Sequence, residues 1–199
     1  MWYGNKVYPI LVSGEFIRTI TNDAYDDLAV HDSQLYATDG HSPSVHVYDC
    51  RTWQKLRSIN TPCSDSKHVD DLYGHTISVN SKRIRLSCFW QDRIYVLDPH
   101  GTLKETHGPR ITIIASPNEA SEQSYELSEL QRPLICQMND DGEVLLADYL
   151  NDRMLIVTAE GHWRQVKLNG ELQRPSDAVW WNGTLYVSTW DDDKLTMFQ

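Results

Sequence analysis

The chain has 199 residues and a net charge of −10, from 18 Lys and Arg against 28 Asp and Glu. This length allows one domain with a sizeable core. The acidic balance disfavours general nucleic-acid binding, because phosphate backbones are repelled unless basic residues are concentrated locally.

The N-terminus and the cysteines bear on where the protein works. Residues 1–6 lack the basic and then hydrophobic regions of a signal peptide, and no apolar run is long enough to span a bilayer. The four cysteines show neither a CxxC spacing nor a zinc pattern. We therefore expect a cytoplasmic protein that does not bind membranes and has reduced cysteines, with Cys88 and Cys136 as inert residues inside strands.

Short apolar or alternating segments recur along the chain in sets of four. The first segment of each set runs into a turn and is predicted as the innermost strand of its unit. These segments begin at Asp27, Thr76, Ile135 and Asp177. The second segments contain a small residue near their end, at Thr38, Cys88, Ala147 and Ser188. Third segments are predicted at 45–48, 94–97, 154–157 and 195–198, with a further copy at 7–10. Fourth segments are more polar, as expected of an outer edge, and lie at 15–18, 55–58, 102–105 and 163–166.

The tetrapeptide Leu-Gln-Arg-Pro, at 130–133 and again at 172–175, is a second sign of repetition. Four strands per unit of about 40 residues are typical of a β-propeller. We predict an all-β fold, a β-propeller of four-stranded antiparallel blades, as a single region over 1–199. Polar insertions at about 60–74 and 108–129 are predicted as surface loops, the second with a short helix at 118–122.

Both ends of the chain fall within a predicted blade, which gives three complete and two partial blades. An open row of this kind would expose apolar blade faces and strand edges. A closed four-bladed ring would leave residues 7–11 surplus. We therefore expect the chain to be part of a larger propeller.

The linkers between second and third strands share a pattern: an aromatic residue, a short polar stretch, then Asn or Asp followed by Lys or Arg. Copies lie at 2–6, 90–93, 149–153 and 190–194. With the Leu-Gln-Arg-Pro start, this pattern resembles the NHL repeat in the C-terminal propellers of tripartite-motif proteins, although Asp152 replaces the His of that repeat.

The resemblance implies a six-bladed propeller that recruits protein substrates or RNA for an E3 ubiquitin ligase. The RING module of such a ligase has no counterpart in the cysteine and histidine spacings of this chain. Ligase activity would therefore belong to a longer parent chain.

The repeated linkers supply the candidate binding residues. Aromatic and arginine side chains dominate interface energetics. We predict a non-catalytic platform that contacts a protein partner through Trp90, Arg93, Tyr149, Arg153, Trp190 and Lys194. The basic members, each beside an Asp or Asn, have an alternative role in tying adjacent blades together. We expect neither catalysis nor a cofactor.

Two other functions are kept as alternatives. RNA binding is opposed by acidic runs in the predicted loops, and the basic cluster at 82–85 is predicted as a solvated face on the opposite side. A calcium-dependent lactonase or esterase would use Asp27 and Asp177 on the inner strands. The matching Thr76 and Ile135 leave its oxygen ligands incomplete, so no metal site is predicted.

Overall fold

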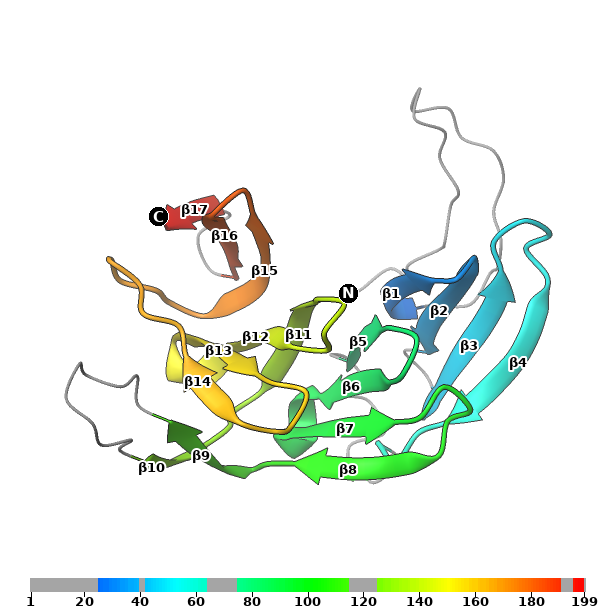
Figure 1. The fold of residues 1–199 in the computed structure, drawn as a ribbon, viewed down its shortest axis with the longest axis horizontal. Helices are drawn as coiled ribbons and strands as arrows, with labels where there is room; N and C mark the ends of the chain where they lie inside the picture. The colour runs from blue at the N-terminus through cyan, green and yellow to red at the C-terminus, as the bar shows by residue number, and fades with distance from the viewer. Residues whose placement is uncertain (1–24, 40–41, 64–74, 115–124, 191–194, 199) are drawn as a thin grey trace.

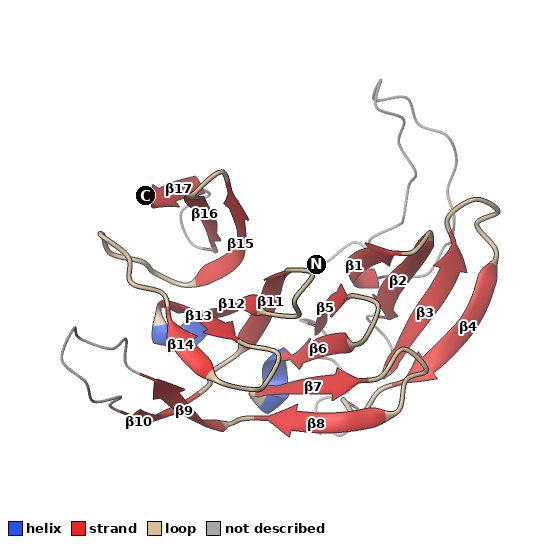
Figure 2. Cartoon of the chain, in the orientation of Figure 1, coloured by secondary structure: helices blue, strands red, loops and turns tan. Residues whose placement is uncertain are grey.

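The computed structural model describes residues 25–39, 42–63, 75–114, 125–190 and 195–198. Within these residues the regular structure is β-strand, apart from two 3-10 turns, and the strands form four sheets arranged as a β-propeller (Figures 1 and 2). The predicted all-β propeller fold is thus confirmed. The predicted strands at 7–10 and 15–18 lie outside the described residues. In the described part of the chain, no helix has the length and hydropathy to cross a bilayer.

Blades 1 and 2 each contain four antiparallel strands in sequence order. Blade 1 consists of β1 (Tyr25–His31), β2 (Gln34–Asp39), β3 (Ser44–Asp49) and β4 (Lys55–Asn60). Blade 2 consists of β5 (His75–Val79), β6 (Ile84–Cys88), β7 (Arg93–Leu97) and β8 (Leu103–His107). Blade 4 has three described strands, which are β15 (Pro175–Trp181), β16 (Thr184–Thr189) and β17 (Leu195–Phe198).

Blade 3 is larger than predicted, with six strands in the order β10-β9-β14-β13-β12-β11. Its four blade strands are β11 (Pro133–Met138), β12 (Val144–Asp148), β13 (Arg153–Val157) and β14 (Trp163–Gln165). The other two come from the insertion and form an antiparallel hairpin of β9 (Arg110–Ile114) and β10 (Tyr125–Glu129). Strand β9 runs parallel to β14, so the hairpin extends the blade at its outer edge.

The hairpin corrects the prediction that 108–129 is a surface loop. Ile111 and Ile113 alternate with exposed residues along β9, and both are buried in the core. This two-residue period is that of a strand with one buried face, and only the position of the core shows what it packs against. The candidate helix at 118–122, and residues 64–74 of the other insertion, lie outside the described residues.

The inner strands β1, β5, β11 and β15 lie around the centre of the arc, and β4 and β8 lie at its rim (Figure 1). Neighbouring inner strands pack on one another, β1 on β5, β5 on β11 and β11 on β15. The prediction that the first segment of each unit is innermost is therefore confirmed.

The core consists of clusters between successive blades. One joins blades 1 and 2 around Val47 and Ile84, the next joins blades 2 and 3 around Ile94 and Leu146, and another joins blades 3 and 4 around Met154. Each of these five side chains is 0 % exposed. Strands β6 and β12 are buried along their whole length because both faces of a middle strand meet a neighbouring blade.

Arg83 and Arg85 correct the prediction of a solvated basic face at 82–85. Arg85 is 1 % exposed, and its Nη2 donates a hydrogen bond to the backbone carbonyl of Thr158 (3.3 Å). Arg83 Nη1 donates to the carbonyl of Ala159 (2.6 Å). Both side chains therefore cross from blade 2 to the turn between β13 and β14. Desolvation lowers the pKa of Arg85 to about 10.

The cysteines also differ from expectation. Cys63 and Cys88 are joined by a disulfide, whereas Cys50 and Cys136 are free. The bridge links the segment that follows β4 to the end of β6, so it connects blade 1 to blade 2.

Leu146→Ala should lower the free energy of unfolding by about 2–5 kcal/mol, because it leaves a cavity in the core between blades 2 and 3. Leu127 on β10, which is 71 % exposed, supplies the matched control. Leu127→Ala should change stability by no more than about 0.5 kcal/mol. Urea unfolding of the full chain measures both, and equal losses would contradict this packing.

Candidate functional site

Two short turns between the second and third strands of blades 2 and 3 shape the predicted binding face. They are the 3-10 turns η1 (Phe89–Gln91) and η2 (Tyr149–Asn151). Each ends at an aspartate with left-handed backbone, Asp92 with φ 53° and Asp152 with φ 52°. Aspartate visits this conformation more readily than most residues, so these positions fix where each turn stops.

The turns correct the predicted alignment of the aromatic residues. Phe89 and Tyr149 each open a turn and are equivalent, whereas Trp90 is equivalent to Leu150. Trp90 and Leu150 are both 42 % exposed, and Tyr149 is 8 % exposed. Trp90 therefore faces outwards, and Tyr149 packs into the molecule.

The two left-handed aspartates join neighbouring blades. Asp92 Oδ1 accepts a hydrogen bond from the backbone N–H of Arg132 (2.7 Å), and Asp152 Oδ1 accepts one from that of Arg174 (2.8 Å). Arg132 and Arg174 occupy the same position of the two Leu-Gln-Arg-Pro repeats, and both have positive φ. The repeated linker motif thus ties adjacent blades together through its aspartate.

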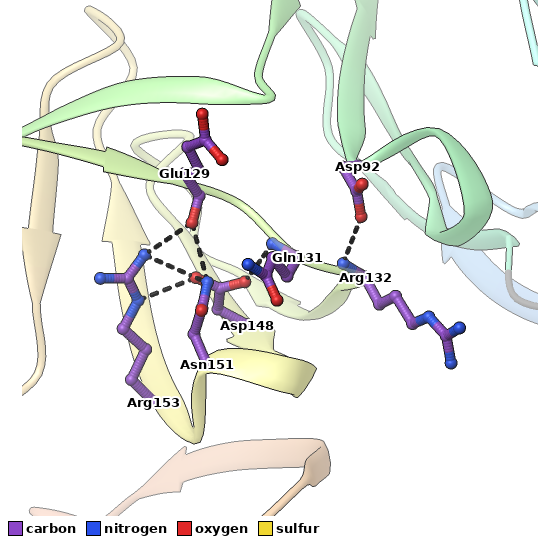
Figure 3. Close-up of polar contacts among 7 residues, drawn as sticks. All are labelled: Asp92, Glu129, Gln131, Arg132, Asp148, Asn151 and Arg153. Carbon is purple, nitrogen blue, oxygen red and sulfur yellow. Dashed lines mark hydrogen bonds and ion pairs between the residues drawn. The ribbon is translucent and has the colours of Figure 1, made fainter.

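Arg153, predicted as a partner contact, is engaged within the fold (Figure 3). Its Nε and Nη2 lie 2.8 and 2.7 Å from Asp148 Oδ2, and Nη2 also donates to the backbone carbonyl of Glu129 (3.1 Å). Asp148, 0 % exposed, also accepts hydrogen bonds from Asn151 Nδ2 (2.8 Å) and the backbone N–H of Gln131 (2.7 Å). The cluster fastens the segment that leads into blade 3 to the end of β12.

Four aromatic side chains follow one another across blades 2, 3 and 4, and we call them the aromatic row: Trp90, Phe89, Tyr149 and Trp190. Successive ring centroids lie 5.2, 5.6 and 6.3 Å apart, which is within the range of favourable aromatic pairs. The two tryptophans at its ends are 42 % and 54 % exposed. The structure thus brings the three predicted aromatic residues together through Phe89, which was not among the predicted contacts.

A groove of about 480 Å³ opens beside Trp90, between blades 2 and 3. The guanidinium carbon of Arg132 lies 4.4 Å from the Trp90 ring centroid and 5.2 Å from that of Phe89, a cation–π arrangement. In Figure 3 the Arg132 side chain points away from the Asp148 cluster. Among the described residues Arg132 forms no ion pair with a carboxylate. Arg132 is not among the predicted contacts, because the Leu-Gln-Arg-Pro repeat indicates repeated architecture and carries no signal of where its arginine side chain lies.

The other two predicted basic residues are Arg93 and Lys194. Arg93 is half-buried at the start of β7 and takes the register position that Arg153 has in blade 3. Its cross-strand neighbour is Cys88 where Arg153 has Asp148, so the ion pair of blade 3 has no equivalent there. Lys194 lies outside the described residues.

Equivalent positions on the four inner strands hold Asp27, Thr76, Leu134 and Asp177. The predicted alignment with Ile135 was therefore one residue off. Asp27 Oδ2 accepts the backbone N–H of Ile77 in the next blade (2.8 Å), and Thr76 Oγ1 accepts that of Ile135 (2.5 Å). Asp27 thus joins blades 1 and 2. The Leu134 side chain offers no oxygen, and the two described carboxylates at these positions fall short of the six or more oxygens that calcium takes.

No protein-family model matches the chain, and no curated protein sequence matches it. Solved structures do match. An auxiliary nutrient binding protein from Bacteroides thetaiotaomicron has a TM-score of 0.65 at 13 % identity, over 94 % of this chain and 50 % of that one. Virginiamycin B lyase from Staphylococcus aureus has a TM-score of 0.58 at 12 % identity, over 98 % of this chain and 59 % of that one. A streptogramin B lyase has a TM-score of 0.55 at 14 % identity, over 98 % and 76 %.

These likenesses establish the β-propeller fold, and none of them supports membership of the NHL or tripartite-motif families. This chain spans about half to three quarters of the length of these structures. The prediction that the chain performs no catalysis was drawn from its propeller architecture, and it is contradicted. The matching propellers include virginiamycin B lyase and a streptogramin B lyase, so this fold can carry an enzyme. The fold is compatible with binding and with catalysis.

Asp148→Ala should lower the free energy of unfolding by about 3–5 kcal/mol, because it leaves Arg153 and two other donors without their buried acceptor. Asp152→Ala is the control, since Asp152 is exposed and accepts one backbone hydrogen bond. It should cost about 1 kcal/mol. Denaturant unfolding compares the variants, and a cost for Asp148→Ala no greater than that of the control would contradict the role of the cluster.

The free energy of unfolding of Asp27→Asn, measured relative to that of the native chain, should increase as the pH rises from about 4 to 7. Desolvation raises the pKa of Asp27 from 3.8 to about 6, and the charge of Asp177 adds to the shift. Between these values the folded state binds more protons than the unfolded state, so the native chain loses stability with rising pH. Asn keeps an oxygen for Ile77 and does not titrate. Urea unfolding across this range should show a difference that grows by up to about 3 kcal/mol, and a constant difference would contradict it.

Proposed function

We propose that this chain is a cytoplasmic recognition module that binds a protein partner across the aromatic row and the groove beside Trp90. The observation that carries the proposal is the Arg132 guanidinium stacked 4.4 Å from the Trp90 ring centroid in that groove. Tryptophan and arginine are among the residues most enriched in interface hot spots. The Asp92 hydrogen bond holds the Arg132 backbone in place, so little ordering is needed on binding.

The groove suits a partner segment that carries a carboxylate beside an apolar side chain. The planar guanidinium of Arg132 can form two parallel hydrogen bonds with a carboxylate. Trp90 and Leu150, both 42 % exposed, offer apolar surface on the rim. Asp92 and Glu129 also line the groove, and they would repel the continuous row of phosphates on an RNA backbone more strongly than a single carboxylate on a protein, which favours a protein over RNA.

The similar propeller named as a nutrient-binding protein supports binding as a use of this fold, at an identity that leaves the ligand open. The finer form of the proposal is that the bound partner is a substrate of a tripartite-motif-like ubiquitin ligase. That form is supported by the linker pattern and the Leu-Gln-Arg-Pro repeats alone.

Trp90→Ala and Arg132→Gln should each weaken binding of a captured protein partner by about 30-fold or more, the loss of a hot-spot residue. The purified chain serves as bait in a cell lysate with ultraviolet crosslinking. Proteins lost with both variants are then titrated against each chain. Trp181→Ala is the matched control, because Trp181 is 62 % exposed at the turn between β15 and β16, at the opposite end of the strands.

The thermal midpoint of each variant is measured in parallel. Binding lost in the Trp90 and Arg132 variants and kept in the Trp181 variant, with similar thermal midpoints, supports the proposal. Partners that bind all variants equally would contradict it, as would crosslinked RNA as the main species lost.

A further inference from the structure

Three side chains of types that bind metals lie close together in blade 2. Cys88 ends β6, His75 begins β5 directly opposite it, and Cys63 comes from the segment after β4. The two sulfur atoms and one His75 ring nitrogen all lie within 4.8 Å of one another. Cys63 is 4 % exposed and Cys88 is 0 % exposed, so both sulfurs are shielded from solvent.

This set occupies the place that the Asp148 cluster has in blade 3. Cys88 pairs with the first residue of its inner strand, as Asp148 does with Pro133. In blade 3 the carboxylate of Asp148 holds the incoming residue Gln131, and in blade 2 Cys88 holds the incoming residue Cys63. The same position therefore anchors the chain as it enters the blade, by a hydrogen bond to a carboxylate in blade 3 and by a disulfide in blade 2.

The chemistry of the three side chains suits zinc. Thiolate sulfur and neutral imidazole nitrogen are the preferred ligands of Zn²⁺, and Cys and His sets hold it in a tetrahedral arrangement. His75 Nδ1 is buried and has no hydrogen-bond partner among the described residues. Such a nitrogen carries a desolvation cost that coordination of a metal would remove.

We propose that Cys63, His75 and Cys88 form a Zn²⁺ site when the disulfide is reduced. Two-electron reduction breaks the sulfur–sulfur bond and yields two thiols, and each thiol gives up one proton as it binds the metal. The protein then supplies three ligands, and the fourth position takes water or another donor. Metal or disulfide performs the same structural task, which is to fasten the segment after β4 to blade 2. The cytosol keeps thiols reduced, so there the metal-bound form replaces the bridge.

The test uses the full chain after reduction by a phosphine, which forms a phosphine oxide and competes weakly for metal, followed by buffer exchange. Zinc affinity is measured by competition with a chromophoric chelator. Co²⁺ replaces Zn²⁺ in a parallel titration, because thiolate ligands give it a charge-transfer absorption. We expect one metal per reduced chain, bound at least about 100-fold more tightly than by the unreduced chain. The unreduced protein is the built-in control, since its fold is intact and the thiolates of Cys63 and Cys88 are absent.

Variants assign the ligands. The double variant C63S/C88S should abolish the charge-transfer band, because it removes both thiolate ligands. His75→Ala should weaken zinc binding by about tenfold or more, since loss of even a supporting contact at a metal site costs that much. The double variant C50S/C136A removes the two free cysteines and should bind as the native chain does. No band in the reduced native chain would overturn the proposal. A band that persists in C63S/C88S, or zinc affinity unchanged in His75→Ala, would also overturn it.

Discussion

The fold depends on the packing of each blade's apolar faces against its neighbours. A single four-stranded sheet leaves both faces of its middle strands open to water, and only a second blade covers them. Val47 and Ile84, from successive blades, share one such core, and Ile94 and Leu146 share the next. Because these contacts lie between sheets, the blades are stable as a stack rather than singly.

Apolar burial has little direction, so polar contacts set how the blades meet. Asp92 and Asp152 each accept a backbone N–H of the next blade, and Asp27 does so at the centre. Asp148 adds a buried ion pair with Arg153 at the end of β12, within blade 3. The aspartates repeated in the sequence therefore act mainly between blades, and the basic residues beside them differ in role from one blade to the next.

The candidate binding face lies on these same contacts. The aromatic row crosses from blade 2 to blade 4, and the groove lies where Asp92 meets the backbone of Arg132. The rigidity of this face therefore depends on the contacts that hold neighbouring blades together. In blade 2 the equivalent of the Asp148 cluster is the pair of Cys63 and Cys88, so one anchoring task is served by two chemistries.

The sequence by itself determined the strands, their grouping in fours and which strand of each unit is innermost, because a two-residue period and turn residues are local signals. It also predicted Trp90 and Trp190 as candidate contacts, and both lie in the aromatic row. Tertiary structure decided that β9 and β10 extend blade 3, that Arg85 is buried, and that Cys63 meets Cys88 across 25 residues. Each depends on which distant surface lies opposite a residue, and local spacing carries no information about that partner.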